Sequence, residues 1–571
     1  MYYKDRGDYL MKRALFLVTA GLVALTWASL ETVGQTNFWS GDGTNLGGSG
    51  VWDTTNPRFG TSTGGPFNLT WADTPTFVTN VVSFRGTPGN VTIQSGGLQA
   101  NRIEVAVGGY TFSGGVITSS QSGAQTLITR TFGAAATVTF NNNFILTTNG
   151  SLNIPIRNLT PGLTNPLVLG GTFLFTDGAG IKRIDLDSTA TGRVDVTGGL
   201  LHTPGATVQF RVGNNAGAGG NLSVYNFSGN STHNGGLLLV RGIVNVSSAS
   251  AIGTGQVQFA TLATATNDTL RFFVSGPINM SNPFVVSGPA STAIVTSVLG
   301  KDVGDASTST LSGFISLANS NNNLEIRVTD AAARLNITGE VTDGAIVRGF
   351  NKTGNGTLNL ARLAGNTYDG PTIVNAGTLL VNNTSGSGTG TGGIQLHGGT
   401  TLGGTGILAG IVTTLTNTAT IAPGNDNIGK LTVGGADWTQ GVTLRFELGL
   451  ATTPGVTYDQ LVITNVLTGP TGTGNLQIAL TNSGSVSYGV PYTLFTFATQ
   501  SGFDYGDVNF LSLPAQLDPN FGNGGMLITS SGFQVQFLEL QIPEPSVLTL
   551  LGGGGLVFYL KRRIRFNRPP A

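Results

Sequence analysis

Short apolar runs alternate with turn-forming residues along most of the chain between residues 81 and 431. Typical runs are 90–94, 206–212 and 377–381, which are rich in Val, Ile, Leu, Thr and Phe, and Gly-Gly, Asn-Gly or Asp-Gly pairs separate such runs. Alternating β-branched and aromatic residues bounded by these pairs are typical of strands. No amphipathic pattern long enough for a helix is convincing between the two ends of the chain. We therefore expect an all-β protein.

A turn-strand-turn unit recurs within this region. Asn-Gly at 234–235 precedes the run 242–246, and Asp-Gly at 369–370 precedes the run 377–381, with glycines seven positions apart in both copies. Short strands with one turn each suit a β-solenoid, in which coils of roughly 20 to 25 residues pair with their neighbours. Gly, Asn and Asp suit its corners, and Asn and Thr can form hydrogen-bonded ladders between coils.

The pattern changes after Trp438, where longer strands carry Phe and Tyr at alternating positions. Because the last coil of a solenoid exposes an open edge, we expect a C-terminal β cap or sandwich to cover it. The expected strands lie at 442–448, 461–463, 476–480, 492–497 and 533–537. An exposed aromatic platform in this region would instead indicate a carbohydrate-binding module.

Composition narrows the class further. Of 571 residues only 10% are charged, against about 25% in ordinary soluble domains, and 87 are Gly. Gly shows no G-X-Y period, which excludes collagen, and 39% hydrophobic residues are too many for a disordered chain. Cys is absent, so the core and backbone ladders alone must hold the fold. Its absence also excludes thiol catalysis and Cys-ligated metal sites.

The N-terminus has the three parts of a secretory signal peptide. Lys12 and Arg13 precede the apolar run 14–25, and Ala28 offers a small residue for cleavage. Met11 is a second candidate initiator, because the ten residues before it carry two aspartates, which is unusual ahead of a signal peptide. The alternative is an uncleaved membrane anchor, although the run is short for a span of about 20 residues.

The C-terminus combines an extended acidic motif, an apolar run at 547–560 and a basic end. Prolines on both sides of Glu544 keep the motif extended and accessible to a processing enzyme. The apolar run is marginal for a membrane span, and the basic end would stay cytoplasmic by the positive-inside rule. The motif is Pro543, Glu544 and Pro545, and the membrane-orienting residues are Lys561, Arg562, Arg563 and Arg565.

These features in this order resemble the PEP-CTERM sorting signal of Gram-negative bacteria. The resemblance covers residues 542–571 and implies processing by an exosortase-type enzyme, a transient inner-membrane anchor and a host that makes exopolysaccharide. A generic tail anchor is the alternative. Four basic and two acidic residues precede Ser29, and five basic and one acidic follow Pro543, so the processed chain has 19 basic and 25 acidic residues. Such an acidic chain without basic runs is a poor nucleic-acid binder.

The segment from 349 to 449 resembles the autotransporter-associated β-strand repeat. The resemblance rests on the ordered motifs at 351–360, 365–370, 375–382, 402–406 and 421–425 and is weaker at 81–118 and 229–259. It implies a right-handed parallel β-helix and a passenger-like surface protein. Trp39, Trp52 and Trp71 lie in a Gly-rich segment similar to the cap that opens such proteins, where we expect them to pack rather than stack on carbohydrate.

Candidate catalytic and metal-binding residues are few. Asp185 and Asp187 are two positions apart, so a strand would place both on one face, and Asp195 follows. Paired carboxylates could hold calcium or act as a general base, as in polysaccharide lyases on parallel β-helices. Lys182, Arg183 and Arg193 lie nearby, however, and favour a solvated ion-pair face.

Other candidate sites are weaker still. His202, His233 and His397 lack ligand spacing and are expected at turns or on the surface. The Asn-Asp-Asn turn at 425–427 lacks a calcium loop of EF-hand length. Gly-x-Gly spacings such as 386–388 open no helix and indicate turns rather than a phosphate cradle. We expect no cofactor.

Together the sequence predicts an exported structural or adhesive protein of the cell surface or extracellular matrix, associated with exopolysaccharide. The alternative is a polysaccharide-active lyase or hydrolase using Asp185, Asp187 and Asp195. The expected parts are a signal peptide at 1–28, a cap at 29–80, β-helix repeats at 81–436 that are clearest at 349–436, a β-rich domain at 437–541 and the sorting signal at 542–571.

Overall fold

A computed structural model describes the chain in segments. These are residues 35–73, 81–121, 125–131, 136–148, 150–188, 191–213, 222–260, 269–287, 296–317, 324–424 and 427–539. The expected signal peptide with Ala28 lies outside them. So do the sorting residues Pro543, Glu544 and Pro545 and the basic residues Lys561, Arg562, Arg563 and Arg565. In the described residues no helix is long and apolar enough to cross a membrane.

The described residues form an all-β fold with parallel strands in long sheets, as the sequence predicts. Its single helical element is the 3₁₀ turn Tyr505–Asp507. The chain divides into two compact units, Met1–Leu402 with Gly406–Leu415, and Gly403–Thr405 with Thr416–Ala571, so the division passes through β38 (Thr401–Gly404) and again just after β39 (Ile407–Thr414).

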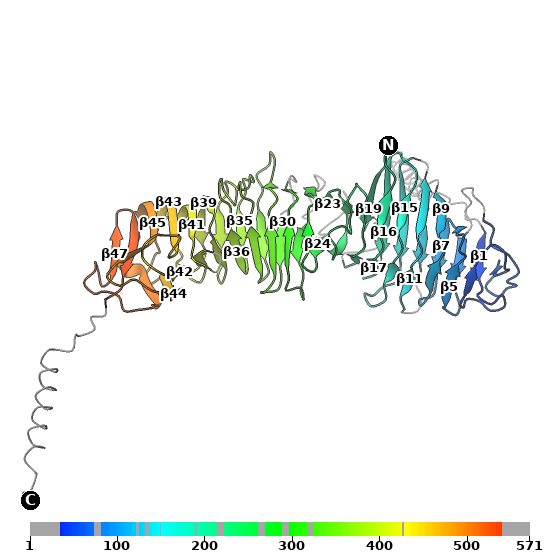
Figure 1. Ribbon diagram of the computed structural model, residues 1–571, viewed down its shortest axis with the longest axis horizontal. Helices are drawn as coiled ribbons and strands as arrows, with labels where there is room; N and C mark the ends of the chain where they lie inside the picture. The colour runs from blue at the N-terminus through cyan, green and yellow to red at the C-terminus, as the bar shows by residue number, and fades with distance from the viewer. Residues whose placement is uncertain are drawn as a thin grey trace, which may run out of the picture. The chain divides into compact units, whose positions relative to one another are not determined.

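The first unit contains sheets whose successive strands come from successive coils of chain. In Figure 1, β7 (Arg102–Val105), β16 (Ile181–Ser188) and β19 (Thr207–Val212) belong to one such sheet. Its strands, in spatial order, are β3 (Phe59–Gly60), β1 (Thr36–Trp39), β4 (Val81–Phe84), β7 (Arg102–Val105), β10 (Ile128–Arg130), β13 (Leu152–Asn158), β16 (Ile181–Ser188), β19 (Thr207–Val212), β21 (Leu237–Leu239), β23 (Val257–Ala260), β26 (Phe284–Ser287), β29 (Ile315–Ser316) and β32 (Val341–Thr342). All neighbours pair in parallel except β1 and β3, which pair antiparallel at the end of the sheet.

The second sheet of this unit is also parallel. It contains β2 (Gly50–Trp52), β5 (Asn90–Ile93), β8 (Thr111–Gly114), β11 (Val138–Phe140), β14 (Leu167–Leu169), β17 (Arg193–Val196), β20 (Val224–Phe227), β22 (Gly242–Val246), β24 (Thr269–Val274), β27 (Thr296–Lys301), β30 (Leu324–Val328), β33 (Phe350–Thr353), β35 (Thr372–Val374), β37 (Ile394–Leu396) and β39 (Ile407–Thr414).

Two shorter runs of parallel strands complete the first unit. One run is β6 (Leu98–Gln99), β9 (Ile117–Gln121), β12 (Phe144–Thr148), β15 (Phe173–Phe175) and β18 (Leu200–His202). The other is β25 (Asn279–Met280), β28 (Thr308–Leu311), β31 (Arg334–Ile337), β34 (Thr357–Leu360) and β36 (Thr378–Val381). This arrangement is compatible with a parallel β-solenoid.

The second unit also contains parallel strands. One sheet contains β41 (Lys430–Asp437), β43 (Gln460–Thr468) and β45 (Pro491–Ser501), and the other contains β40 (Thr420–Pro423), β42 (Val442–Leu448), β44 (Leu476–Asn482) and β46 (Val508–Ser512). β48 (Gly532–Gln536) lies between β45 and β47 (Met526–Thr529) and pairs antiparallel with both. The longer strands of the expected C-terminal cap or sandwich therefore pair mainly in parallel, and β47 and β48 add an antiparallel end.

Coil length varies more than the expected 20 to 25 residues. Val81 pairs with Arg102, 21 positions later, whereas Asp195 pairs with Asn226, 31 positions later. In the second unit Leu461 pairs with Phe495, 34 positions later. The repeat period is irregular because both parts of a coil change in length: β43 has nine residues where β4 has four, and the corner after β13 (159–166) is longer than the corner after β33 (354–356).

Apolar side chains at matching positions fill the interior. Phe112 and Phe140 are paired in register on β8 and β11, and their rings stack with centroids 4.3 Å apart. Phe144 and Phe173 do the same at 4.8 Å on β12 and β15. Each buried ring contributes roughly 1.5–3 kcal/mol of hydrophobic stabilisation. Stacks of identical residues therefore fill the core and also fix the register between neighbouring strands.

Outward-facing asparagines form the expected ladders. Asn382 donates to Asn359 at 2.7 Å, and Asn359 donates to Asn336 at 2.9 Å, so one ladder links β31, β34 and the residue after β36. A second ladder runs from Asn245 to Asn226 and on to Asp195. In both ladders each side-chain amide donates a hydrogen bond to a residue of the preceding coil. These bonds add to the backbone hydrogen bonds between the strands.

Three lysines lie completely buried. Lys182 and Lys301 each meet an aspartate, Asp177 and Asp305 respectively. Lys352 instead donates to three backbone carbonyls, those of residues 353, 354 and 376, at 2.7–3.0 Å, and so joins two successive coils. Burial lowers the pKa of Lys352 to about 7.

Replacing the central member of the first ladder tests its contribution. Asn359→Ala removes both side-chain hydrogen bonds of Asn359 and should lower the free energy of unfolding by about 1–3 kcal/mol. Gln395→Ala, at an exposed position of β37, is the matched control and should leave the urea midpoint unchanged. Equal midpoints for both variants would show that the ladder adds no stability.

The buried amine of Lys352 should make stability pH-dependent. Below pH 7 the folded and unfolded chains both carry the proton, whereas between about pH 7 and its ordinary pKa of 10.5 only the unfolded chain does. The free energy of unfolding should therefore rise with pH in this window, by at most about 1.4 kcal/mol per pH unit. Thermal unfolding of Lys352→Met beside the wild type measures the difference in slope; parallel profiles would contradict it.

Candidate functional site

The strongest group of charged side chains lies on the outer face of the first sheet. Asp185 and Asp187 alternate on β16 with Ile184 and Leu186, which are fully buried, so strand alternation turns the carboxylates to the opposite face. The two candidate aspartates therefore share one face of the strand, as their spacing predicts. The same face carries Arg157 on β13, Arg183 on β16 and Arg211 on β19, as the paired registers of these strands show.

Asp185 is held by a two-pronged ion pair. The Nε of Arg211 donates to its Oδ1 at 2.8 Å, and the Nη2 of Arg211 donates to its Oδ2. Burial raises the pKa of Asp185, and this effect outweighs the opposing influence of Arg211. Because Asp185 is only 2% exposed, its carboxylate is an internal partner for arginine in this structure and is closed to a large substrate.

The rest of the cluster is similarly engaged. Arg157 lies 3.9 Å from Asp187, which is 3% exposed. The Nε of Arg183 donates to Gln209 at 3.0 Å. Burial, together with repulsion from Arg211, lowers the pKa of Arg183. The expectation of a solvated ion-pair face is thus wrong in one respect: the ion pairs are present, but the aspartates are buried.

Asp195 does not join this cluster. It lies on β17 in the second sheet and pairs with Arg193 at 2.7 and 2.9 Å. Asp195 also accepts a hydrogen bond from the side-chain amide of Asn226 and so forms the end of the second ladder. The three aspartates considered together in the sequence therefore belong to two sheets.

The histidines form no ligand group among the described residues, although His202 lies close enough to His233 to affect it electrostatically. His233, expected at a turn or on the surface, is completely buried, and its ring packs edge-on against Phe210 with centroids 5.2 Å apart. Burial lowers the pKa of His233 to about 4, so it is neutral at physiological pH. His202 lies on β18 and is half-buried, and His397 is exposed in a turn.

Metal ligands do not gather in the part of the chain that the structure covers. Among the described residues no group of three His, Cys, Asp or Glu side chains could hold a metal ion. Of the Asn-Asp-Asn turn, Asn425 and Asp426 lie outside those residues.

The tryptophans of the N-terminal segment are core residues. Trp39 and Trp52 are fully buried, Trp71 is 5% exposed, and the rings of Trp52 and Trp71 meet edge-on at 5.1 Å. They pack with Phe59 and Phe84. Burial supports cap packing and leaves these rings no face for carbohydrate.

Aromatic residues after Trp438 are mostly internal as well. Tyr492, Phe495 and Phe533 are fully buried, and the last two rings stack at 5.1 Å. Tyr488 is exposed but does not make a platform by itself. This distribution counts against the carbohydrate-binding module considered from the sequence.

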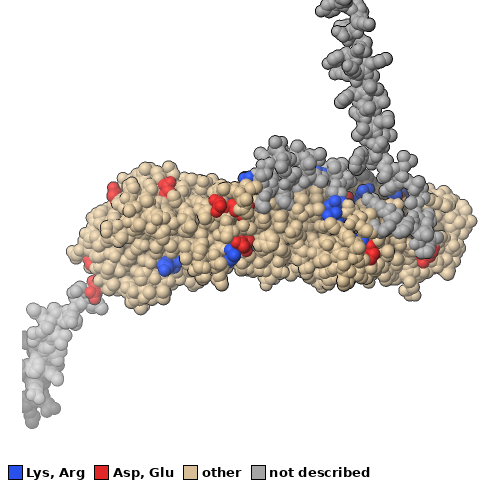
Figure 2. Space-filling model, turned by 90° about the horizontal axis from the view of Figure 1, so that it is seen from above, with Lys and Arg blue, Asp and Glu red and all other residues tan. Residues whose placement is uncertain are grey.

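The visible surface is sparsely charged. Figure 2 shows one face of the molecule, on which basic and acidic residues are scattered among a large majority of uncharged ones. Several opposite charges are adjacent, in keeping with ion pairs such as Arg327 with Glu325 and Arg362 with Glu340. The polar groups on the surface therefore belong largely to Thr, Ser and Asn side chains.

The coils from β33 to β36 are nearly equal in length. Phe350 pairs with Thr372, and Thr357 with Thr378, so these coils are 22 and 21 residues long. Lys352 and Asn359 lie within them. A shallow cavity of about 280 Å³ on this segment is lined by residues 347–351, Pro371 and Ile373.

A comparison with known families gives a match that falls on these coils. Residues 350–381 match the family described as the passenger-associated-transport-repeat. A comparison with curated proteins found no match. The chain is thus similar over this stretch to repeats of autotransporter passengers, which suggests a passenger-like, exported surface protein and supports the expected autotransporter-associated repeat.

The ion pair of Asp185 should be a structural requirement. Asp185→Ala leaves the guanidinium of Arg211, whose side chain is 14% exposed, without its carboxylate and should lower the free energy of unfolding by about 3–5 kcal/mol.

Glu104→Ala breaks the more exposed pair with Arg85 and serves as the control, with an expected loss of at most about 1 kcal/mol. Chemical denaturation measures both. Equal losses would mean that burial does not set the strength of these pairs.

Proposed function

We propose that this protein is an exported structural and adhesive protein of the cell surface or extracellular matrix. It passes the inner membrane by its N-terminal signal, is held there transiently and is sorted through Pro543, Glu544 and Pro545 by an exosortase-type enzyme. Outside the cell it associates with exopolysaccharide. The match of residues 350–381 to a passenger repeat is the observation that carries the proposal.

Features of the described residues support an adhesive surface. Parallel coils present rows of Asn, Thr and Ser, whose amides and hydroxyls can exchange hydrogen bonds with sugar hydroxyls. Charged side chains are few and are often paired with each other, so the fold presents little charge to repel a polysaccharide of either sign. The processed chain contains no cysteine, which suits a protein held by its ladders alone.

A polysaccharide-active enzyme is the second candidate. The observation that favours it is the convergence of Asp185 and Asp187 with Arg157, Arg183 and Arg211 on one sheet face. A carboxylate with a raised pKa beside arginines could act as a general base. The small exposure of both aspartates favours the structural role instead.

Processing can be tested by intact mass. The protein recovered from the envelope and from the medium of its native host should begin near Ser29 and end close to Pro543. Replacing Pro543, Glu544 and Pro545 with Ala should leave the full C-terminus and retain the protein in the membrane fraction.

Replacing Pro514 and Pro519 with Ala is the matched control and should leave processing intact. A full-length C-terminus in every wild-type fraction would refute sorting, while leaving export to be judged from the N-terminus.

A further inference from the structure

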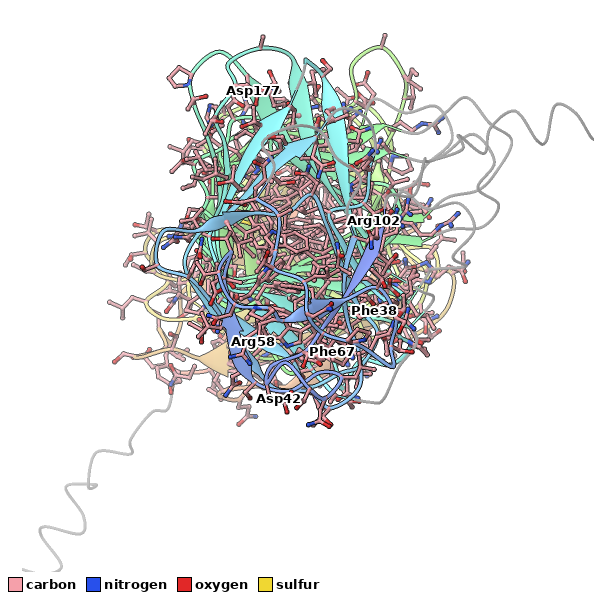
Figure 3. The ribbon with its side chains drawn as sticks, turned by 90° about the vertical axis from the view of Figure 1, so that its right-hand side faces the viewer. Phe38, Asp42, Arg58, Phe67, Arg102 and Asp177 are labelled. Atoms are coloured by element: carbon pink, nitrogen blue, oxygen red, sulfur yellow. The ribbon has the colours of Figure 1, made fainter. Side chains whose placement is uncertain are left out.

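A polar pocket lies at the end of the first unit that carries β1. The segment between β1 and β2 folds over the turn that follows β4, and Figure 3 looks onto this end, where Asp42 is labelled. The cavity has a volume of about 320 Å³. Its lining residues are Asp42, Asn45, Leu46, Gly47, Gly48, Ser49 and Thr87.

The core holds this pocket in shape. The indole of Trp39 donates to the carbonyl of Gly48 at 3.0 Å, and the hydroxyl of Tyr110 contacts the carbonyl of Thr87 at 2.8 Å. Gly47 forms bridges with Ser40 and Thr87 at a φ of +88°, and a Cβ there would lie 2.4 Å from the carbonyl oxygen of Thr87. Arg58 donates to the carbonyl of Gly41 at the base of the loop. The pocket is therefore built before any ligand arrives.

Asp42 is fixed but keeps acceptor capacity. Its Oδ1 accepts from Ser40 and from the backbone N–H groups of Thr44 and Asn45, whereas its Oδ2 accepts only the Asn45 amide, at 2.7 Å. A carboxylate oxygen can accept two hydrogen bonds. These donors hold the pKa of Asp42 well below its usual range, so the side chain stays ionised.

The other lining groups complement this acceptor. The oxygen of Ser49 accepts the N–H of Asn90 at 2.9 Å, which leaves its hydroxyl proton for a ligand. Thr87 adds a second exposed hydroxyl, and Leu46 adds an apolar surface. A fixed carboxylate, two hydroxyls and one apolar side chain match the alternating hydroxyl and C–H surfaces of a sugar ring.

We propose that this pocket binds one neutral pyranose unit of a polysaccharide. Its volume is at the lower end of the range of about 300–1,000 Å³ for ligand pockets, which suits one ring rather than several. The charge of Asp42 disfavours uronic acids and sulfated sugars. This inference rests on the proposed association with exopolysaccharide and names the residues and the class of sugar.

Asp53 supplies a matched comparison within the chain. It binds the backbone N–H groups of Thr55 and Asn56 and the Asn56 amide in the same pattern, but it is 7% exposed and lines no part of this pocket. A loss of binding caused by disturbance of this turn type alone would therefore appear in Asp53→Asn as well as in Asp42→Asn.

The test uses the full-length protein in detergent, titrated with the methyl α-pyranosides of glucose, galactose and mannose and with a methyl glucuronoside. Saturation-transfer NMR and calorimetry should detect one neutral glycoside and not the glucuronoside. Asp42→Asn should weaken its binding at least tenfold at an unchanged unfolding temperature, and Ser49→Ala should weaken it severalfold. Asp53→Asn should bind as the wild type does.

Three results would overturn the proposal: no binding of any neutral glycoside, equal binding by Asp42→Asn, or Asp42-dependent binding of calcium chloride with no sugar. Whole-cell association with exopolysaccharide, measured on the same variants, distinguishes a failure of the pocket proposal from a failure of the proposed function. If the wild type associates and Asp42→Asn associates equally, the pocket is refuted while the proposed function stands. If the wild type fails to associate, the proposed function fails.

Discussion

Parallel pairing between coils is the constraint on which the other features depend. Each strand bonds to the coil before it and the coil after it, so a given position must face inward in every coil. Ile103, Ile128 and Ile156 are in register and all fully buried. The same alternation turns Asn, Thr and charged residues outward and sends the chain through tight corners, where glycine is favoured. Low charge and high glycine content are thus consequences of one geometry.

This geometry also decides what charged groups can do. A side chain that faces inward or lies under its neighbours loses water and must find partners within the fold. Lys182 and Lys301 meet carboxylates, whereas Lys352 meets carbonyls of two coils. Asp185 and Arg211 follow the same rule on the outer face. Residues that look catalytic in a sequence become connections between coils when burial removes their access to solvent.

The sequence predicts the strands and turns of this fold better than it predicts the burial of a side chain or its contacts with other coils. Alternation and turn pairs predict the strands, and the motifs at 349–449 predict the repeat that the family match supports. Asp185 and Asp187 share a face because a strand alternates, but their burial depends on arginines from coils that are 26 and 30 residues away in the pairing. His233 is buried because its turn folds against Phe210, which its neighbours do not reveal. In the pocket around Asp42, Thr87 lies against a loop some forty residues earlier in the sequence, a contact that local patterns do not predict. The turn of that loop does have a sequence signal, because Asp-x-x-Asn occurs at 42–45 and again at 53–56.

The unequal coils have a consequence for how such a chain can change. Between Pro155 and Asp185 the chain covers 30 positions, against 22 between Phe350 and Thr372, yet both pairs stay in register; the corner after β13 spans 159–166, whereas the corner after β33 spans only 354–356. Corners therefore act as insertion points at which segments can be lengthened, shortened or exchanged while the ladders remain aligned. A scaffold of this kind can diversify what it displays without rebuilding its interior.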